Sequence, residues 1–327
     1  MGLNARHCMA FVTAILLFGL TGCSTSPGTG EEKIPSVIFI DYVEDETLAE
    51  ARKGFVDALS SAGFSEEKKT VALTFRNAQS DQPTLLQIVD YAKSAAPDLI
   101  ATNTTLAMIN TVKRIKETPV FMMVAPSPEL AGLVQADNNA PSNLFGVYET
   151  LAYIDTSALL IPYLFPKAKV AGAIFSQGEP QSVDALKRIE ETLKKAGITL
   201  IALPVSHSGE TQLITETLLA KGIDVFFALP DNVIFSSFET VVKSCNRKGI
   251  PVVTSEAGLV ARGALASFGA DMYQWGFQSG LQAAQYLKTG STDGLQPEIV
   301  AVRKKVMNAA AATQFGITPD SSFVYLR

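Results

Sequence analysis

The chain has 327 residues, of which 47% are hydrophobic and 18% are charged, and its formal net charge is −5. This length accommodates two domains with substantial cores, and the composition is that of a globular protein, which excludes a disordered chain. A mildly acidic chain without blocks of Lys or Arg binds nucleic acid poorly, so we expect no nucleic-acid partner.

Residues 1–22 are expected to be a signal peptide. Arg6 gives a short basic region, and residues 9–20 form an apolar segment that is too short to span a bilayer as a helix. The segment ends in Leu20-Thr-Gly-Cys23, which resembles the lipobox of bacterial lipoproteins. The resemblance implies that Cys23 carries a lipid and is the first mature residue. The alternative is a plain signal peptide with a chance cysteine.

Residues 23–33 are expected to be the lipidated cysteine and a flexible tether, because residues 24–33 show no periodicity. A lipid, a tether and a soluble body indicate an extracytoplasmic protein that is anchored to a membrane, at its periplasmic face or in an outer leaflet, and does not cross it. Cys8 would leave with the signal, which leaves Cys245 alone, so the mature chain forms no internal disulfide.

The first half of the folded part alternates strand and helix patterns. Short apolar runs predict strands, and apolar residues at helical spacing predict helices, as at Leu48, Ala51 and Phe55. The expected strands are 36–42, 70–75, 98–105 and 118–124, and the expected helices are 47–63, 84–96 and 106–116. This order predicts a parallel sheet with right-handed crossovers. Residues 125–143 break the pattern and are interpreted as a loop, and residues 144–148 are expected to make the first crossing to a second lobe.

The same cycle recurs in the second half. Residues 223–229 are almost entirely apolar and are bounded by Gly222 and Pro230, which is typical of a strand buried on both faces of a parallel sheet. The other expected strands are 169–175, 198–203 and 249–254, and the expected helices are 154–164, 183–196, 211–220 and one that follows Asn232. This duplication predicts two Rossmann-like α/β lobes that face each other across a cleft.

The last part of the chain is expected to complete both lobes. Residues 263–269 are interpreted as a strand that returns to the first lobe, followed by a helix over 271–288, a third crossing at 298–302 and a helix over 304–315. The predicted lobes are therefore 34–145 with 267–298, and 146–266 with 299–327, joined by a three-segment hinge.

Most enzyme and cofactor signatures are absent from the sequence. It has no Gly-x-Gly-x-x-Gly after the first strand, no phosphate loop and no Gly-x-Ser-x-Gly. The mature chain has a single histidine, His207, so a metal site or a histidine-based triad lacks visible partners. We therefore expect neither an enzyme, a cofactor nor a metal.

Polar and aromatic residues gather just past the ends of the predicted strands, and open α/β sheets bind ligands at that edge. The candidate ligand-binding residues are Tyr42, Glu44, Asn103, Thr104, Thr105, Ser127, Tyr148, Ser176, Glu179, Ser182, Asp231, Asn232 and Glu256.

Hydroxyls and helix N-termini suit a ligand carboxylate, which we place nearest Asn103, Thr104, Thr105 and Ser127. The Asp231 carboxylate suits an ammonium group, and Tyr42 suits the ligand side chain. The alternative is that Asp231, Ser127, Thr104 and Glu179 only cap helices, because N-caps favour the same residue types.

Several runs resemble the substrate-binding lipoproteins of ABC transporters that have a type I periplasmic-binding-protein fold, a group associated with tryptophan and tyrosine uptake. The runs are 51–59, Asn77-Ala-Gln79, Ala131-Gly-Leu133, Pro230-Asp-Asn232, 262–269 and Tyr273-Gln-Trp-Gly276, and they extend over most of the mature chain. The resemblance implies a ligand held between the lobes, with Asp231 matched to the ligand amine and Glu44, Glu179 and Ser182 on matched polar positions. Three cleft loops, at 124–128, 104–105 and 176–182, depart from the pattern of the group.

We therefore expect a lipid-anchored binding protein of an ABC importer, which binds a small ligand and delivers it to a permease. The ligand implied is an amino acid, and aromatic amino acids are among the candidates. One alternative is a sensory protein that presents its ligand to a receptor, and another is an α/β enzyme of the cell envelope.

If Cys23 is lipidated, Cys23→Ser should release the protein from membranes without unfolding it. Membrane fractionation in the native host checks this. Wild-type protein that is already fully soluble there would exclude the anchor.

Overall fold

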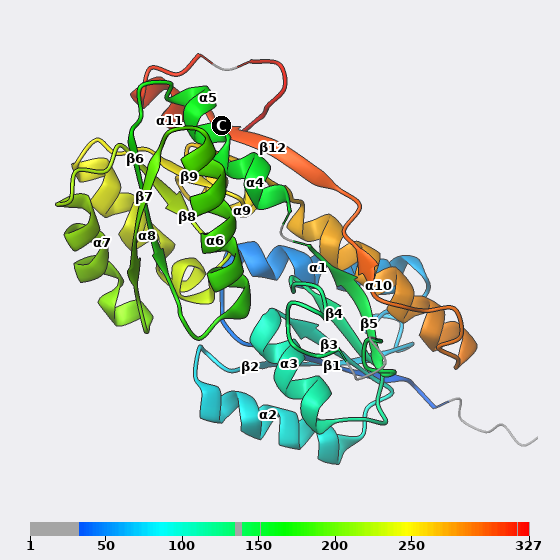
Figure 1. Cartoon of the computed structure of the whole chain (residues 1–327). Helices are drawn as coiled ribbons and strands as arrows, with labels where there is room; N and C mark the ends of the chain where they lie inside the picture. Colours follow the sequence, from blue (N-terminus) through cyan, green and yellow to red (C-terminus); the bar gives the residue numbers. More distant parts are fainter. Residues whose placement is uncertain (1–32, 135–138, 151, 319, 327) are drawn as a thin grey trace, which may run out of the picture. The chain divides into compact units, whose positions relative to one another are not determined.

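The computed structural model describes residues 33–134, 139–150, 152–318 and 320–326. The expected signal peptide, lipobox and nearly all of the tether lie outside these residues. Residues Ile34–Arg327 form one compact unit. Within it, two sheets with their helices make two α/β lobes, as the sequence predicts (Figure 1).

The first lobe is built on a six-stranded sheet in which every recorded pairing is parallel. Its order is β11-β5-β4-β3-β1-β2. The strands are β1 (Ser36–Asp41), β2 (Ala72–Asn77), β3 (Leu99–Asn103), β4 (Val120–Met123), β5 (Leu144–Tyr148) and β11 (Glu298–Ile299). All residues of β3 and β4 are buried, because helices cover both faces of the sheet there.

The second lobe is built on a seven-stranded sheet of order β13-β12-β10-β9-β8-β6-β7. Its strands are β6 (Val170–Phe175), β7 (Thr199–Pro204), β8 (Val225–Ala228), β9 (Val252–Thr254), β10 (Ala266–Ala270), β12 (Arg303–Asn308) and β13 (Val324–Leu326). The β10–β12 pair is antiparallel and the other pairs are parallel. The whole of β8 is buried, which agrees with the apolar run that predicts it.

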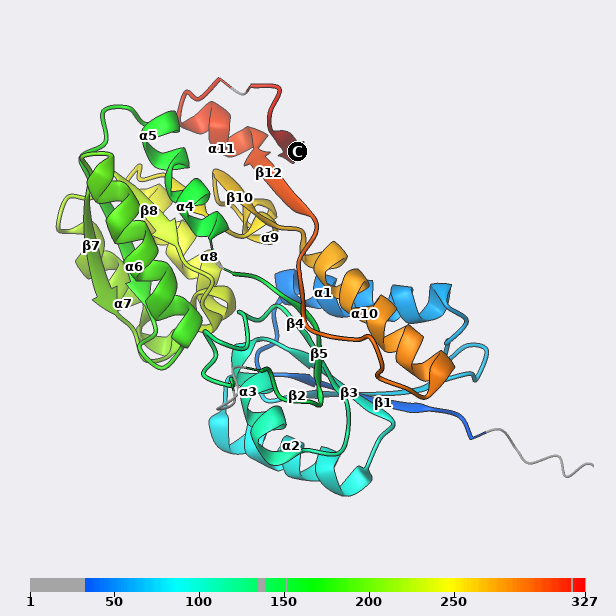
Figure 2. The same ribbon diagram turned by 45° about the vertical axis from the view of Figure 1, so that its right-hand side comes forward.

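Helices cover both faces of each sheet (Figure 2). In the first lobe they are α1 (Glu46–Ser61), α2 (Gln82–Ala95), α3 (Thr105–Arg114) and α10 (Met272–Thr289). In the second lobe they are α4 (Tyr153–Ala158), α5 (Leu160–Leu164), α6 (Pro180–Lys195), the 3-10 helix η1 (Ser208–Glu210), α7 (Thr211–Leu219), α8 (Asn232–Arg247), α9 (Ala257–Ala261) and α11 (Ala309–Gln314). Figure 1 shows α2 and α3 on one face of the first sheet and α1 and α10 on the other.

Several expected elements differ from the structure. The helix predicted over 154–164 is two helices, α4 and α5, and α6 begins at Pro180 and not at 183. The pairing of β10 with β9 and β12 places it in the second sheet, so the expectation that this strand returns to the first lobe is wrong. The boundaries expected at 146 and 267 fall inside β5 and β10.

The helix expected over 304–315 begins as a strand. Its first part is β12, which carries Arg303, Lys304 and Lys305 and buries only Val306 and Met307. This strand lies next to the short strand β13 near the edge of the sheet, so it lacks the long apolar run of a central strand. For the same reason β13 gives no signal in the sequence.

Three chain segments pass between the lobes, after β5, after β10 and between β11 and β12. Hydrogen bonds and ion pairs tie them together. The Arg303 guanidinium makes two bonds, of 2.8 and 2.9 Å, to the buried Glu149 carboxylate. Lys304 pairs with Asp271, whose N–H donates to the Val302 carbonyl at 3.0 Å. These contacts hold the three crossings side by side.

Helices α1 and α10 pack so closely that three glycines are required between them. A Cβ added at Gly276 would lie 1.7 Å from the Ala51 carbonyl oxygen, and one at Gly54 would lie 2.0 Å from the Tyr273 carbonyl oxygen. At Gly280 the nearest atom would be the Phe55 carbonyl oxygen, at 2.6 Å. The obstructing atoms are backbone, so they cannot move aside as a side chain would.

We predict that Gly276→Ala lowers the free energy of unfolding by about 3 kcal/mol or more, the upper part of the range for overpacking. Gly178→Ala is the matched control, because the nearest atom to its added Cβ is 3.8 Å away. Urea denaturation of both variants checks this. Equal midpoints would show that the helices can separate without cost.

Candidate functional site

A cavity lies between residues of the two lobes. Its accessible volume is about 30 Å³, and about 370 Å³ of empty space, open solvent included, lies between the lining residues. The first lobe contributes Thr104, Thr105, Val124, Ala125, Pro126 and Trp275, and the second contributes Tyr153, Gln181, Pro230, Asn232, Phe235 and Glu256. The cavity therefore suits a small ligand that contacts both lobes at once.

Four of the residues predicted from the sequence line this cavity: Thr104, Thr105, Asn232 and Glu256. They follow strands β3, β8 and β9, so the ends of these three strands meet at the cavity. Among the lining residues Glu256 is the only charged side chain.

Two lining residues have a strained backbone. Thr104 has φ = 83° and Val124 has φ = 50°, which is rare for β-branched residues. They end neighbouring strands β3 and β4, where the Thr104 N–H donates to the Met123 carbonyl at 3.2 Å. Strain of this kind persists where the surrounding structure enforces it, and ligand sites are a common place for it.

Glu256 is a buried carboxylate with one unused oxygen. Its Oε1 accepts hydrogen bonds from the Tyr153 hydroxyl at 2.6 Å and the Ser255 hydroxyl at 2.9 Å. Its Oε2 is buried and finds no hydrogen-bond partner among the described residues. Burial raises the pKa of Glu256 to about 7, and the nearby Glu149 charge acts in the same direction. A cation in the cavity would supply the missing partner.

Two further lining residues carry buried oxygens with no partner in the described part of the chain, the Thr104 hydroxyl and Oε1 of Gln181. Buried polar atoms are normally hydrogen-bonded. Three such atoms around one cavity indicate that a bound molecule completes their bonding.

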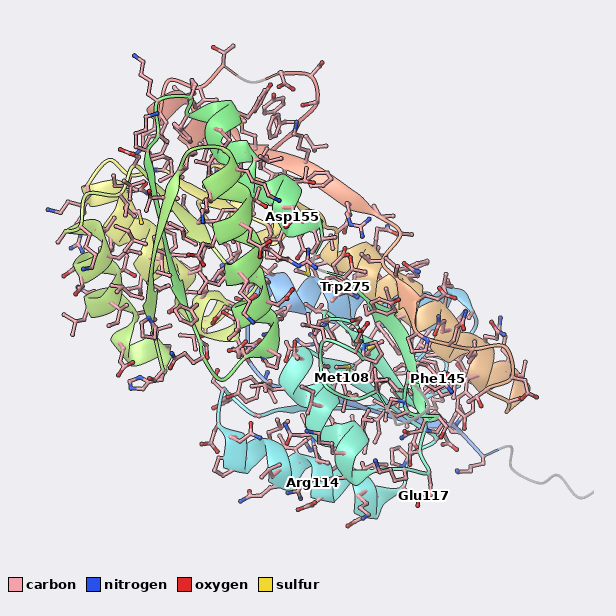
Figure 3. All side chains as sticks on the ribbon, in the orientation of Figure 1. Met108, Arg114, Glu117, Phe145, Asp155 and Trp275 are labelled. Carbon is pink, nitrogen blue, oxygen red and sulfur yellow. The ribbon has the colours of Figure 1, made fainter. Side chains whose placement is uncertain are left out.

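Aromatic rings form much of the rest of the wall. Trp275, labelled in Figure 3, comes from the first turn of α10, where the chain has just crossed between lobes. Its indole N–H donates to the Val147 carbonyl at 2.8 Å, and the Tyr153 hydroxyl is bonded to Glu256. With these polar atoms already paired, Trp275, Tyr153 and Phe235 offer apolar surface to a ligand.

These aromatic residues and Gln181 were not among the ligand-binding residues expected from the sequence. Tyr153 and Phe235 follow the apolar pattern of helices α4 and α8, and that pattern does not separate core positions from a cavity wall. Gln181 lies in the 176–182 run but was expected in a loop, whereas α6 begins at Pro180. The only sequence signal for this aromatic wall is Trp275, which is the single tryptophan of the chain and lies beside a crossing between the lobes.

A second, more polar opening lies beside the cavity, and Asn232 lines both. Predicted residues Tyr42, Ser176 and Glu179 line this opening, not the cavity. The Tyr42 hydroxyl donates to the Ser80 carbonyl at 2.9 Å, and its pKa is raised by burial and by the Glu179 charge. These three residues therefore lie beside the cavity and not in its wall.

Both oxygens of the Asp231 carboxylate accept hydrogen bonds from groups of their own lobe. Its Oδ2 accepts from the Ser176 N–H at 2.7 Å and the Ser182 hydroxyl at 2.6 Å, and its Oδ1 accepts from the N–H groups of Val233 and Ile234. It is fully buried and caps α8. The capping alternative therefore describes Asp231 in this structure, because no oxygen of the group is left for a ligand amine.

Glu179 lies next to Asp231 and is also held by its own lobe. Its Oε2 accepts from the Asn232 N–H at 3.0 Å and the Asn232 side-chain amide at 2.8 Å. Burial raises the pKa of Glu179 well above its usual range, and the Asp231 charge adds to this effect. The pair orients Asn232, which does line the cavity.

The remaining predicted residues lie elsewhere. Glu44 is on the surface, where it accepts from the Asn77 amide at 2.8 Å and lies 3.8 Å from Arg52. Asn103 is buried and donates to the Leu48 carbonyl. The Ser127 hydroxyl accepts a hydrogen bond from the Leu130 N–H within the same turn. Tyr148 is half-buried and packs against the core of the first lobe.

The described residues contain neither a helix suited to crossing a membrane nor a cluster of metal ligands. None of the helices in these ranges is long and apolar enough to cross a membrane. No group of three or more His, Cys, Asp or Glu in the same residues could hold a metal ion.

The sequence model of a protein family described as ABC transporter substrate binding protein matches residues 36–325. The chain belongs to this family. It is therefore a binding protein and not an enzyme, as expected from the missing catalytic motifs.

A tyrosine-binding protein of Clostridioides difficile (strain R20291) is 32% identical to this substrate-binding protein over 278 residues, which cover 82% of this chain and 80% of the relative. Among solved structures, a Streptococcus pneumoniae ABC domain in complex with L-Trp superposes with a TM-score of 0.81 at 25% identity, covering 89% of this chain and 99% of the other. Sugar-binding proteins, such as a glucose-galactose binding protein of Geobacillus stearothermophilus with 15% identity and a TM-score of 0.62 over 84% of this chain and 98% of the other, share the fold. The predicted type I periplasmic-binding-protein fold is confirmed.

The ligand-free, open structure of a substrate-binding protein with adhesive properties from Clostridium difficile superposes less well. Its TM-score is 0.66 at 26% identity, over 90% of this chain and 99% of the other. Identity and coverage match those of the L-Trp complex, so they do not account for the difference. The overall superposition is thus better with the L-Trp complex than with the ligand-free, open structure.

We predict a pH-dependent gain in stability for Glu256→Gln in the absence of ligand. The folded-state pKa of about 7 lies above the usual value of 4.5, so the wild type loses stability as pH rises from 4.5 to 7. The variant avoids this loss, and its advantage should grow over that window to about 3 kcal/mol and then level off. Denaturant midpoints at a series of pH values check this. A difference that does not vary with pH would show that Glu256 does not titrate there.

Proposed function

We propose that this substrate-binding protein binds an aromatic amino acid, tryptophan or tyrosine, between its lobes. The observation that carries the proposal is the buried Glu256 carboxylate, whose Oε2 lacks a partner among the described residues at the wall of the cavity. The named ligands of the tyrosine-binding relative and of the L-Trp complex support the same class.

The ligand ammonium group would bind Glu256. It supplies a positive charge and several N–H donors, which the unpaired oxygens of Glu256 and Gln181 can accept. A charge-assisted bond in a site without water is stronger than the same bond at the surface. Ammonium binding also favours the ionised carboxylate and so would lower the raised pKa of Glu256.

The ligand carboxylate would bind at the start of α3. No Lys or Arg belongs to the lining residues, so the negative group must use hydroxyls and backbone N–H groups. Thr104 precedes the helix without capping it through its side chain, and the first bond within the helix runs from the Met108 N–H to the Thr104 carbonyl. The N–H groups of the first turn are therefore free of helical partners, and the helix dipole favours an anion there.

The ligand ring would lie among Trp275, Tyr153 and Phe235, with Pro126 and Pro230 closing the wall. Offset or edge-to-face contact between aromatic rings adds about 0.5–1.5 kcal/mol to the burial of their surface. An aromatic side chain therefore gains more here than an aliphatic one of similar size.

The proposal also includes membrane anchoring and delivery of the ligand to a permease. The protein would be held to the envelope membrane through a lipid on Cys23 and would deliver its ligand to the permease of an ABC importer. The lipobox-like sequence and membership of the family support this role.

Calorimetry with L-tryptophan and L-tyrosine tests the proposal. Glu256→Gln keeps the side-chain shape and removes the charge, so it should weaken binding by roughly thirty-fold to several-thousand-fold, which corresponds to a loss of about 2–5 kcal/mol. Tyramine, which lacks the carboxylate, and 3-(4-hydroxyphenyl)propionate, which lacks the amine, should each bind far more weakly than L-tyrosine.

Glu44→Gln is the matched control, because Glu44 lies on the surface outside the cavity and should not affect affinity. Wild-type protein that binds neither amino acid would contradict the ligand class. Unchanged affinity in Glu256→Gln would contradict the assignment of the ammonium group.

A further inference from the structure

Arg262, which follows α9 in the second lobe, contacts both the wall of the cavity and the opposite lobe. Its Nη2 donates to the Phe235 carbonyl at 2.8 Å, and Phe235 lines the cavity. Its Nη1 bonds the carboxylate of Asp45, which belongs to the first lobe. The Arg262 side chain is 12% exposed and the Asp45 side chain 1%, so this ion pair is shielded from water.

On its own lobe, Arg262 bridges a kink in α8. Ser237 has a non-helical backbone, which separates the first turn of α8 from the rest of the helix. Arg262 donates to the Phe235 carbonyl before the kink and makes two bonds, of 2.7 and 3.0 Å, to the Glu239 carboxylate after it. Its guanidinium lies 5.5 Å from the centre of the Phe238 ring. The first turn carries Asn232 and Phe235 into the cavity, so Arg262 fixes the angle at which they meet a ligand.

On the opposite lobe, Arg262 reaches the start of α1. Asp45 caps this helix by accepting from the Leu48 N–H at 3.1 Å, and the Thr47 hydroxyl lies 3.4 Å from Arg262. The Thr47 side chain packs closely on Gly258 of α9 at the same place, because a Cβ added at Gly258 would lie 2.1 Å from the Thr47 methyl group. The N-terminus of α1 and helix α9 therefore form a direct contact between the lobes.

We propose that Arg262 is a positioning residue for ligand binding, which fastens the closed lobes through Asp45 and sets the cavity-lining turn of α8. This inference rests on the proposed binding of a ligand between the lobes. The pair with Asp45 joins the two lobes, so opening of the lobes would break it, whereas the pair with Glu239 lies within one lobe and would survive opening. Closure thus completes the set of bonds that holds Phe235 and Asn232 against the ligand.

Asp45→Asn tests this with little change to the fold. Asn caps helices as well as Asp does, so α1 keeps its cap while the charge facing Arg262 is lost. Ligand dissociation should become about tenfold faster, because loss of a buried charge pair acts mainly on the dissociation rate. The melting temperature of the ligand-free protein should not change. Fluorescence of Trp275, the only tryptophan, reports L-tyrosine release.

Glu239→Gln is the matched control. It keeps an oxygen that can accept from Arg262 across the kink and removes only the charge of a carboxylate that is 66% exposed and lies within the same lobe. Dissociation in this variant should stay within about twofold of the wild type, as expected for an exposed ion pair.

A second measurement needs no ligand. With Thr47→Cys and Gly258→Cys together, the two Cβ atoms would lie 2.9 Å apart in this structure, so a slight separation of α1 and α9 brings them into the range of a disulfide, about 3.5–4.5 Å. Oxidation of this pair therefore reports closure. Adding Asp45→Asn should slow the cross-linking about tenfold, and adding Glu239→Gln should not.

The inference would be overturned if Asp45→Asn did not slow the cross-linking. It would also be overturned if ligand-free Asp45→Asn had a lower melting temperature than the wild type. A wild-type protein that binds no aromatic amino acid would contradict the proposed function instead, and the cross-linking rates would still decide the role of Arg262.

Discussion

The site depends on one carboxylate that the protein buries without fully pairing. Glu256 has two hydroxyl donors on one oxygen and none among the described residues on the other, and no basic side chain lines the same cavity. Burying an ionised group without a partner is costly, and the raised pKa of Glu256 reflects this. Such a group gains most from a ligand that brings its own positive charge. The hydroxyls, the start of α3 and the aromatic wall around Glu256 then favour a zwitterion with an aromatic ring.

Much of the fold was predictable from the sequence because local patterns and tertiary structure agree. The apolar run 223–229 contains the buried strand β8, and the repeated strand and helix units form the two sheets with their covering helices. The errors are in β10 and β12, which lie toward the edge of the second sheet. β12 buries only Val306 and Met307, so its composition gives a weak strand signal. β10 is mostly buried, and burial alone does not tell which of two sheets a strand joins.

The candidate site was predictable only in part. Thr104, Thr105, Asn232 and Glu256 follow strand ends and line the cavity, as the rule for open sheets predicts. Asp231 obeys the same rule but turns its oxygens to Ser176, Ser182 and the first turn of α8. Sequence position cannot separate a capping carboxylate from one that faces a ligand, because both occur at helix starts. The aromatic wall was missed since a ring in a cavity and a ring in the core follow the same helical spacing.

Closure links the separate parts of the structure. The cavity draws on both lobes, Trp275 bonds Val147 beside a crossing, and Arg262 joins the α8 turn to the cap of α1. Each of these contacts spans segments that are far apart in the sequence. A ligand bound between the lobes, as proposed, would act on the cavity and on the Arg262 contacts, which both join the lobes.

The most direct measurement is a crystal structure of the protein with L-tyrosine or L-tryptophan bound. The ligand nitrogen should lie within hydrogen-bonding distance of Glu256 Oε2, with its carboxylate at Thr104 and Thr105 and its ring against Trp275. A ligand nitrogen bound to Asp231 or Glu179 instead, with Glu256 Oε2 still unpaired, would contradict this account.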